Sequence, residues 1–178
     1  MRIRSIAAAG AAVALLGTGT AASAAPAVER ATQVNLISLR LAMHPNQVAN
    51  VEGDSQNNGA RVILWDLTNA ENERWEPESQ LDGYVRLRAQ SSGKCLNVAG
   101  GGNADGAGVI QYTCGTAANE LWKFNQVGWG YQVVAKSSGK CLNVRGGVVK
   151  GNTLIQYTCA GGAGAANDVW LASWEQPK

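Results

Sequence analysis

The sequence predicts an all-β fold built from three similar units, and two observations carry that prediction. The stretch SSGKCLNV occurs twice, at residues 91–98 and 137–144, and IQYTC follows each copy at residues 110–114 and 155–159. Short runs rich in β-branched and aromatic residues alternate with clusters of Gly, Asn, Ser and Asp, which is typical of strands joined by turns. Beyond the N-terminal segment, little helical periodicity is present.

A third, more divergent unit precedes the two close copies. Its elements align with those of the second unit as follows: residues 48–51 (VANV) with 95–98 (CLNV), Gly59 with Gly106, and residues 62–65 (VILW) with 109–112 (VIQY). A tryptophan marks the end of each unit, at Trp75, Trp122 and Trp170. The three repeats therefore cover about residues 36–80, 81–128 and 129–174.

Three units of this length, each with about four short strands, restrict the architecture. A propeller needs about four blades or more, and a solenoid repeat is usually shorter and leaves open ends. Three hairpin-rich units that close on a threefold axis form a β-trefoil, in which one pair of strands per unit builds a barrel and the other pair caps it. Closure also removes strand edges that invite aggregation. The predicted fold is therefore a β-trefoil with pseudo-threefold symmetry.

The first 24 residues predict a secretory signal peptide. Two arginines precede an apolar run at residues 6–17, and Ala22-Ser23-Ala24 supplies the small residues for cleavage after Ala24. The apolar run is too short to span a bilayer, and no other long apolar run follows. Residues 25–34 then form a short segment before the predicted domain at residues 35–178. We expect a secreted, extracellular monomer without membrane insertion.

Charge and composition exclude several classes of function. Cleavage would remove two arginines, so that Lys+Arg falls from 15 to 13 against 13 Asp+Glu, and no basic stripe that could bind nucleic acid is visible. One histidine and no CxxC pair predict neither a metal site nor a cofactor. The acids of residues 71–78 (ENERWEPE) crowd one turn, and no nucleophile pattern accompanies His44. The protein is therefore not expected to be an enzyme.

Four cysteines in an exported protein are expected to pair, and four allow three pairings. Each close copy of the repeat has one cysteine before a strand-like run and one after it. The repeat therefore favours Cys95–Cys114 and Cys141–Cys159, which close two equivalent loops. In the first unit, Val48 and Leu67 stand where the cysteines would be.

The recurring elements, C-L-[D/N]-V, then G-x-x-V-x-x-aromatic-x-C, then N-x-x-W, resemble those of the ricin B-chain type lectins. That family includes carbohydrate-binding modules on secreted bacterial hydrolases. The resemblance covers about residues 36–174 and implies a β-trefoil with up to three shallow sugar sites. It also implies a structural core role for Trp75, Trp122 and Trp170, whereas Trp129 lies outside the repeat register and is expected on an exposed turn.

This chain departs from the family pattern in its Gln-x-Trp signature. The glutamine of the family's Gln-x-Trp signature is replaced by an acid in all three units, at Glu73, Glu120 and Asp168. An acid accepts hydrogen bonds but does not donate them as an amide does. Gln111 and Gln156 are expected either to contact ligand or to satisfy buried backbone groups.

A sugar site needs an aromatic ring for the apolar face of the sugar, and side chains that accept and donate for its hydroxyls. Each unit supplies one aromatic residue and two asparagines at positions that match the family's site. They are Trp65, Asn50 and Asn72 in the first unit, Tyr112, Asn97 and Asn119 in the second, and Tyr157, Asn143 and Asn167 in the third. The first asparagine of each set replaces the family's aspartate, which removes charge-assisted hydrogen bonds.

The sequence thus predicts a secreted, non-catalytic carbohydrate-binding protein whose partners are glycans or polysaccharides. Weak binding at each site is expected, with multivalency raising the affinity for glycans that reach two sites. The alternative is a secreted β-trefoil that binds protein, such as a protease inhibitor. Threefold recurrence of the aromatic residue and two asparagines favours the first function, because an inhibitor needs one special loop rather than three equal sites.

Overall fold

The computed structural model describes residues 35–160 and 167–175, so the predicted signal peptide lies outside the described residues. The described residues form twelve strands and five 3-10 turns. The strands are β1 (Leu36–Leu41), β2 (His44–Val51), β3 (Val62–Asp66), β4 (Trp75–Ser79), β5 (Val85–Ala89), β6 (Cys95–Val98), β7 (Val109–Tyr112), β8 (Trp122–Val127), β9 (Gly130–Ala135), β10 (Cys141–Val144), β11 (Leu154–Tyr157) and β12 (Trp170–Glu175). The turns are η1 (Glu52–Asp54), η2 (Glu71–Glu73), η3 (Leu81–Gly83), η4 (Ala99–Gly101) and η5 (Ala118–Glu120). No helix in this part of the chain has the length and apolar character needed to cross a membrane.

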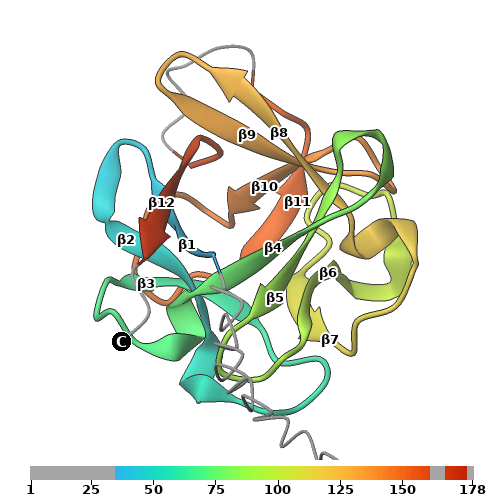
Figure 1. The fold of residues 1–178 in the computed structure, drawn as a ribbon. Coiled ribbons are helices and arrows are strands. Elements are labelled where there is room, and N and C mark those ends of the chain that lie inside the picture. The colour runs from blue at the N-terminus through green and yellow to red at the C-terminus, as the bar shows by residue number, and fades with distance from the viewer. Residues whose placement is uncertain (1–34, 161–166, 176–178) are drawn as a thin grey trace, which may run out of the picture. The chain divides into compact units, whose positions relative to one another are not determined.

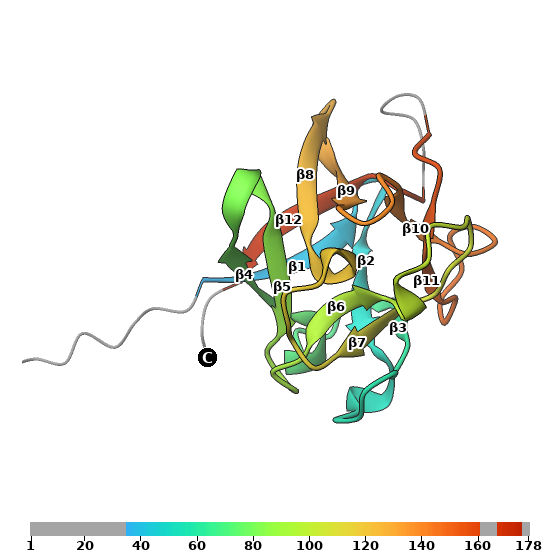
Figure 2. The same cartoon turned by 90° about the vertical axis from the view of Figure 1, so that its right-hand side faces the viewer.

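Six strands close a barrel of antiparallel neighbours in the order β1, β4, β5, β8, β9, β12 and back to β1. The other six strands form three hairpins, β2–β3, β6–β7 and β10–β11 (Figure 1). A side view shows the hairpins toward the right of the barrel (Figure 2). Each unit thus contributes one pair of strands to the barrel and one hairpin to the cap, which confirms the predicted β-trefoil.

The three cap hairpins also pair with one another at equivalent positions. Isolated antiparallel bridges join Arg61 to Ile110, Gly108 to Ile155, and Thr153 to Ile63. Each bridge runs from one unit to the next, and the third returns to the first unit. The cap is therefore a closed ring, in which every hairpin is held by both neighbours.

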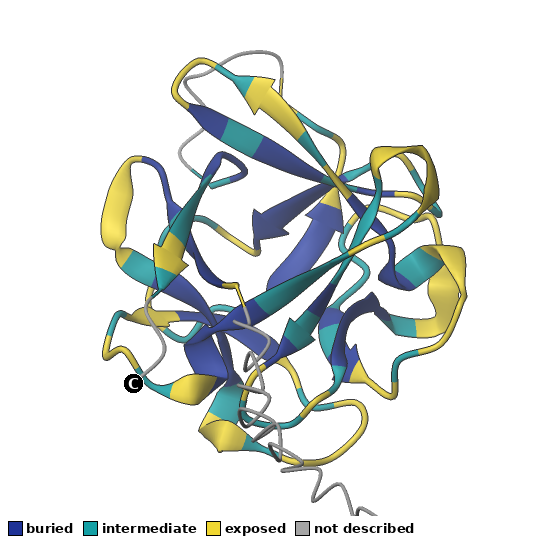
Figure 3. Ribbon diagram, in the orientation of Figure 1, coloured by how far each residue is buried: buried dark blue, intermediate teal, exposed yellow. Residues whose placement is uncertain are grey.

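The tryptophan that ends each repeat lies in the core. Trp75, Trp122 and Trp170 have 0% exposure and stand at the first positions of β4, β8 and β12. Each indole Nε1 donates a hydrogen bond to a carbonyl of a cap hairpin, and the acceptors are Ala49, Leu96 and Leu142, at 3.3, 2.9 and 2.9 Å. The rings thereby join the barrel to the cap, and buried residues line the inside of both layers (Figure 3).

Both disulfides are present with the predicted pairing, Cys95–Cys114 and Cys141–Cys159. Each one ties the first residue of a cap strand to the loop that follows the hairpin. A covalent link of this kind restricts the unfolded chain more than the folded one. In the first unit the fully buried Val48 occupies the place of the first cysteine, so that hairpin is held by packing and hydrogen bonds without a disulfide.

Candidate functional site

The second unit forms a shallow pocket of about 490 Å³ at one side of its cap hairpin. Tyr112, at the end of β7, lines it with a ring that is 48% exposed. Asn97, buried in β6, and Asn119, on turn η5, line the same pocket. Asn119 Nδ2 donates to Asn97 Oδ1 and to the Val98 carbonyl, both at 2.9 Å. The structure thus brings the three predicted residues together.

The first unit has the same arrangement in a pocket of about 420 Å³. Trp65, 37% exposed, lines it with Asn50 and Asn72. Asn72 Nδ2 donates to Asn50 Oδ1 at 3.2 Å and to the Val51 carbonyl at 2.8 Å. This pocket also contains Asp54, a residue that the sequence comparison of the repeats did not single out.

In the third unit, Asn167 Nδ2 donates to Asn143 Oδ1 at 3.0 Å and to the Val144 carbonyl at 3.4 Å. Tyr157, at the end of β11, is 47% exposed. The asparagine pair therefore recurs in all three units with the same donor and the same two acceptors. Residues 161–166, which precede Asn167, lie outside the described part of the chain.

The asparagine pair has a definite hydrogen-bonding state. In the second unit, the two hydrogen bonds that Asn119 donates use both hydrogens of its Nδ2 atom, and Asn97 accepts one of them. The Oδ1 atom of Asn119 can then accept, and the Nδ2 atom of Asn97 can donate. One acceptor and one donor side by side match two neighbouring sugar hydroxyls, each of which can donate and accept. The amide orientations follow from this hydrogen-bond network.

The acids that replace the family's glutamine hold the loop between the aromatic residue and the second asparagine. Glu73, Glu120 and Asp168 are buried, and each accepts a backbone N–H from that loop. The donors are Thr68, Gly115 and Ala160, at 2.9, 2.8 and 2.9 Å. The position therefore needs an acceptor, which a carboxylate supplies as well as an amide does, and the loop keeps its place at the rim of the pocket.

Asp168, the acid of the third unit, has a pKa that is shifted by burial. Burial raises the pKa of its carboxyl above the ordinary value of 3.8, and the bonds from Ala160 N–H and Gln132 Nε2 lower it only in part. Its Oδ1 atom is buried and has no hydrogen-bond partner among the described residues. The pKa of this carboxyl is therefore higher in the folded protein than in the unfolded one. Its contribution to the free energy of unfolding is fully present below the unfolded pKa and is lost as the pH rises through the folded pKa.

We therefore expect Asp168→Asn to raise the free energy of unfolding at pH 7 by about 1 kcal/mol, the size of the penalty for a buried polar group that is poorly paired. The variant keeps an acceptor for Ala160 N–H and removes the buried charge. The gain should vanish near pH 3, where the aspartate is protonated in both states. Urea unfolding of both proteins from pH 3 to pH 7 measures this difference, and a gain that does not change with pH would contradict the assigned cause.

Gln111 and Gln156 do not face the pockets. Both are fully buried, and each donates through Nε2 to two loop carbonyls of the preceding unit. Gln111 binds the carbonyls of Ser55 and Asn57, at 2.6 and 3.0 Å, and its Oε1 accepts from Ser92 Oγ at 2.7 Å. Of the two roles expected from the sequence, these glutamines satisfy buried backbone groups.

The residue after each aromatic is fastened to the neighbouring unit. Thr113 N–H donates to Asn58 Oδ1 at 2.9 Å, and Thr158 N–H donates to Asp105 Oδ1 at 2.8 Å. In the first unit, Lys150 Nζ donates to Asp66 Oδ2 at 2.7 Å and lies 4.3 Å from the centre of the Trp65 ring. The residue that follows each aromatic ring is thus held by a contact between units. Aligning the sequences of the repeats could not reveal these contacts.

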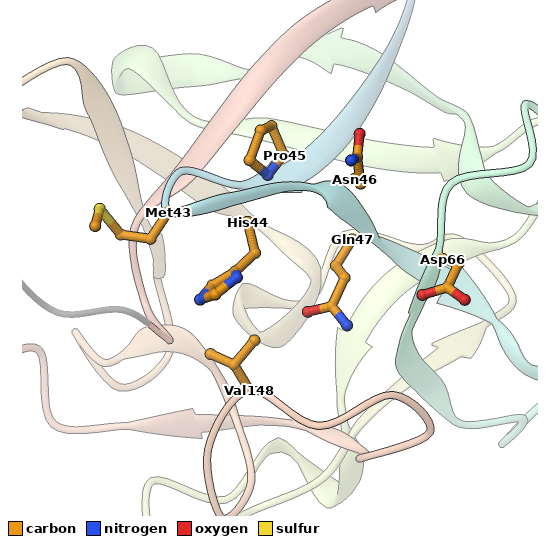
Figure 4. Close-up of a pocket in the computed structure, with 7 residues that line it drawn as sticks. All are labelled: Met43, His44, Pro45, Asn46, Gln47, Asp66 and Val148. Carbon is orange, nitrogen blue, oxygen red and sulfur yellow. The ribbon is translucent and has the colours of Figure 1, made fainter.

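A further pocket, of about 460 Å³, lies at the start of β2. His44 and Gln47 face Val148 on one side of the strand, and Pro45 and Asn46 lie on the other (Figure 4). No Phe, Tyr or Trp side chain is among the residues that line it. Across residues 35–160 and 167–175, no group of three or more His, Cys, Asp or Glu side chains is arranged to hold a metal ion.

Known proteins resemble this chain over most of its length. The family model of the ricin-type beta-trefoil lectin domain matches residues 36–165. The designed threefold-symmetric protein ThreeFoil is 33% identical, with a TM-score of 0.73 over 78% of this chain and 97% of its own. An exo-beta-1,3-galactanase from Clostridium thermocellum is 25% identical, with a TM-score of 0.73 over 81% of this chain and 30% of its own.

The Rhizoctonia solani agglutinin, at 16% identity, shares the fold with a TM-score of 0.69 over 80% of this chain and 96% of its own. No curated protein matches the sequence. The family match spans well over half of the chain and agrees with the closed barrel and the three equivalent hairpins. The chain therefore belongs to the ricin-type β-trefoil lectin domain family.

Proposed function

We propose that this protein is exported and binds glycans without catalysis, in up to three shallow sites that we call the first, second and third site after their units. One observation carries the proposal: a half-exposed aromatic ring stands in every unit, beside a hydrogen-bonded asparagine pair. Two structures of the same fold contain sugars and support it. They are the Polyporus squamosus lectin with Neu5Aca2-6Galb1-4GlcNAc and the C-half of the earthworm R-type lectin with GalNAc.

Each site divides the recognition of a sugar between two kinds of group. The aromatic ring packs against the apolar C–H face of the pyranose, and the asparagine pair binds two hydroxyls at its rim. Neutral amides form weaker hydrogen bonds than a carboxylate would, so each site alone is weak. A glycan that reaches two sites gains affinity through the higher effective concentration at the second site.

Export is proposed from the N-terminal sequence and agrees with the two disulfides of the structure. Disulfides persist in oxidising compartments and are rare in the cytosol. We propose that the mature chain begins after Ala24, with residues 25–34 preceding a lectin domain at residues 35–178, and that it is a monomer. Its three units are proposed to span about residues 36–80, 81–128 and 129–174.

The test is a glycan array, followed by titration of the best array ligand into aromatic variants. Tyr112→Ala and Tyr157→Ala are each expected to weaken binding at their own site by about tenfold, because a stacked aromatic group contributes on the order of 1 kcal/mol beyond its buried area. Both rings are half-exposed, so we expect thermal unfolding to stay close to that of the parent protein. Isothermal titration calorimetry gives the affinities, and circular dichroism gives the unfolding curves.

Trp129→Ala is the matched control, because Trp129 is 64% exposed and lines neither the first nor the second pocket. Its sugar binding is expected to equal that of the parent protein. Intact binding in the double variant of Tyr112 and Tyr157 would contradict the second and third sites. An array without any bound glycan would contradict the proposed function and favour a β-trefoil that binds protein.

A further inference from the structure

We infer that the three sites differ in the sugars they select, and that Asp54 makes the first site prefer sugars with a protonated amine over neutral and acidic sugars. The inference rests on the proposed function and names the ligand class of one site. Asp54 lines the same pocket as Trp65, Asn50 and Asn72. Asp54 is exposed, so its carboxylate is accessible to a ligand from solvent.

The other charges around this pocket are paired. Glu52, which also lines it, receives two hydrogen bonds from the Arg61 guanidinium, at 2.5 and 2.8 Å. Lys150, over the Trp65 ring, is bound by the Asp66 carboxylate at 2.7 Å.

Glu73, which follows Asn72 in the chain, is a further acid of the first unit and does not line the pocket. It is fully buried and receives hydrogen bonds from Asn50, Thr68 and Asn69. Among the described residues, no hydrogen bond or ion pair engages the carboxylate of Asp54. The accessible charge of the first site is therefore negative and belongs to this side chain.

Asp54 has no counterpart in the other units. Its equivalents are Gly101 and Gly147, both with positive φ, at 63° and 99°. Asp54 has the same left-handed backbone, with φ 52°, which most side chains avoid and which Asp and Asn tolerate best after glycine. A carboxylate at this place therefore occurs only in the first site, although the backbone there is shared by all three units.

The carboxylate changes which sugar binds best. A protonated amine on the sugar would donate a charge-assisted hydrogen bond to Asp54 while the pyranose packs against the side of Trp65 that lines the pocket, which Lys150 does not line. A neutral sugar would lose the charge, and a uronic acid would be repelled. Exposed ion pairs contribute about 0.2–1 kcal/mol, so we expect the amine to bind about 1.4-fold to fivefold more tightly than its N-acetylated counterpart.

The experiment titrates matched methyl glycosides into the full-length mature protein at pH 6 and low salt. The probes are glucosamine and galactosamine glycosides, their N-acetylated forms, and the corresponding uronic acids. NMR signals of the Trp65 indole and of the Tyr112 and Tyr157 rings report each site separately. At Trp65 the amine should bind about 1.4-fold to fivefold more tightly than the N-acetylated sugar, and about 1 M NaCl should abolish the difference through screening.

Three variants assign the preference to one side chain. Asp54→Asn keeps the size of the residue and should remove the preference. Asp54→Gly restores the residue of the other two units, so it should also remove the preference without destabilising the fold. Gly101→Asp should transfer the preference to the second site, because a Cβ at Gly101 lies 3.7 Å from Asn119 Cγ and Nδ2, in ordinary contact.

The outcomes separate this inference from the proposed function. If sugars shift the Tyr112 signals but the Asp54→Asn variant keeps the amine preference at Trp65, the inference is wrong and the proposed lectin function stands. An equal response of Trp65 to the amine and the N-acetylated sugar in the parent protein overturns it as well. If no probe or array glycan moves the signals of any site, both the function and the inference fall.

Discussion

Replacing Trp122 by alanine is expected to lower the free energy of unfolding by about 3–5 kcal/mol, the range for large aromatic residues in protein cores. The side chain has 0% exposure and stands at the point where the second unit's barrel strand meets its cap hairpin. Its removal leaves a cavity, because the closed barrel cannot collapse onto the vacated space. It also leaves the Leu96 carbonyl without its 2.9 Å donor. Urea unfolding followed by circular dichroism measures the change.

Trp129→Ala is the control for the same chemical change at an exposed position. The ring is 64% exposed, on the turn between β8 and β9, and the variant should stay within about 0.5 kcal/mol of the parent protein. Similar losses for the two variants would contradict the structural role of Trp122. A second comparison uses Trp122→Phe, which keeps most of the ring and removes the donor, and which should lie between the alanine variant and the parent.

The sequence was sufficient to predict the fold because the repeat carries both kinds of information that a β-trefoil needs. Equivalent spacing of Trp75, Trp122 and Trp170 fixed the number of units, and the alternation of short strands with turn residues fixed their type. The pairing of the cysteines followed from the same repeat, since equivalent residues occupy equivalent positions. These inferences are local or symmetric, so one sequence suffices for them.

The asparagine pairs show where sequence reasoning was weaker. The sequence put Asn97 and Asn119 in one proposed site, yet it did not indicate that one amide holds the other and leaves a defined donor and acceptor. That arrangement depends on strand register, with Asn97 opposite Ile110 in the cap hairpin. Asp54 was missed because alignment of the repeats seeks shared residues, and its importance lies in being different from Gly101 and Gly147.

Contacts between units were beyond the reach of the repeat pattern. The pairings of Thr113 with Asn58 and of Asp66 with Lys150 join equivalent positions through different chemistry. Only the closed fold shows that these positions meet. Leu64 poses the same problem, since it occupies the position at which the other two units have Gln111 and Gln156.

The structure explains this difference through the loop that each residue faces. Gln111 supplies two hydrogen bonds to carbonyls of the first unit's loop, at Ser55 and Asn57. The equivalent loop of the third unit, which lies against Leu64, satisfies its own carbonyls instead. Asn152 Nδ2 donates to the carbonyls of Arg145 and Gly147 within that loop, at 2.8 and 3.2 Å. An apolar residue is therefore sufficient in the first unit.

Gln111→Leu should consequently destabilise the protein, although leucine is the natural residue at the equivalent position of the first unit. The change conserves volume approximately and removes three hydrogen bonds, which gives an expected loss of about 2–3 kcal/mol at about 1 kcal/mol for each bond. Gln126→Leu makes the same substitution at an exposed position of β8 and should change stability by less than about 0.5 kcal/mol. Urea unfolding measures both variants.

Hydrogen exchange distinguishes the proposed cause from a general loss of packing. In Gln111→Leu, protection should fall first around residues 55–59, because the lost bonds hold that loop to β7, whereas the third unit's loop around Asn152 should keep its protection. Uniform loss of protection across the three units would contradict this assignment. Agreement would establish that the pseudo-symmetric fold is stabilised by different contacts at each junction, because each glutamine is needed only where the adjoining loop cannot pair its own carbonyls.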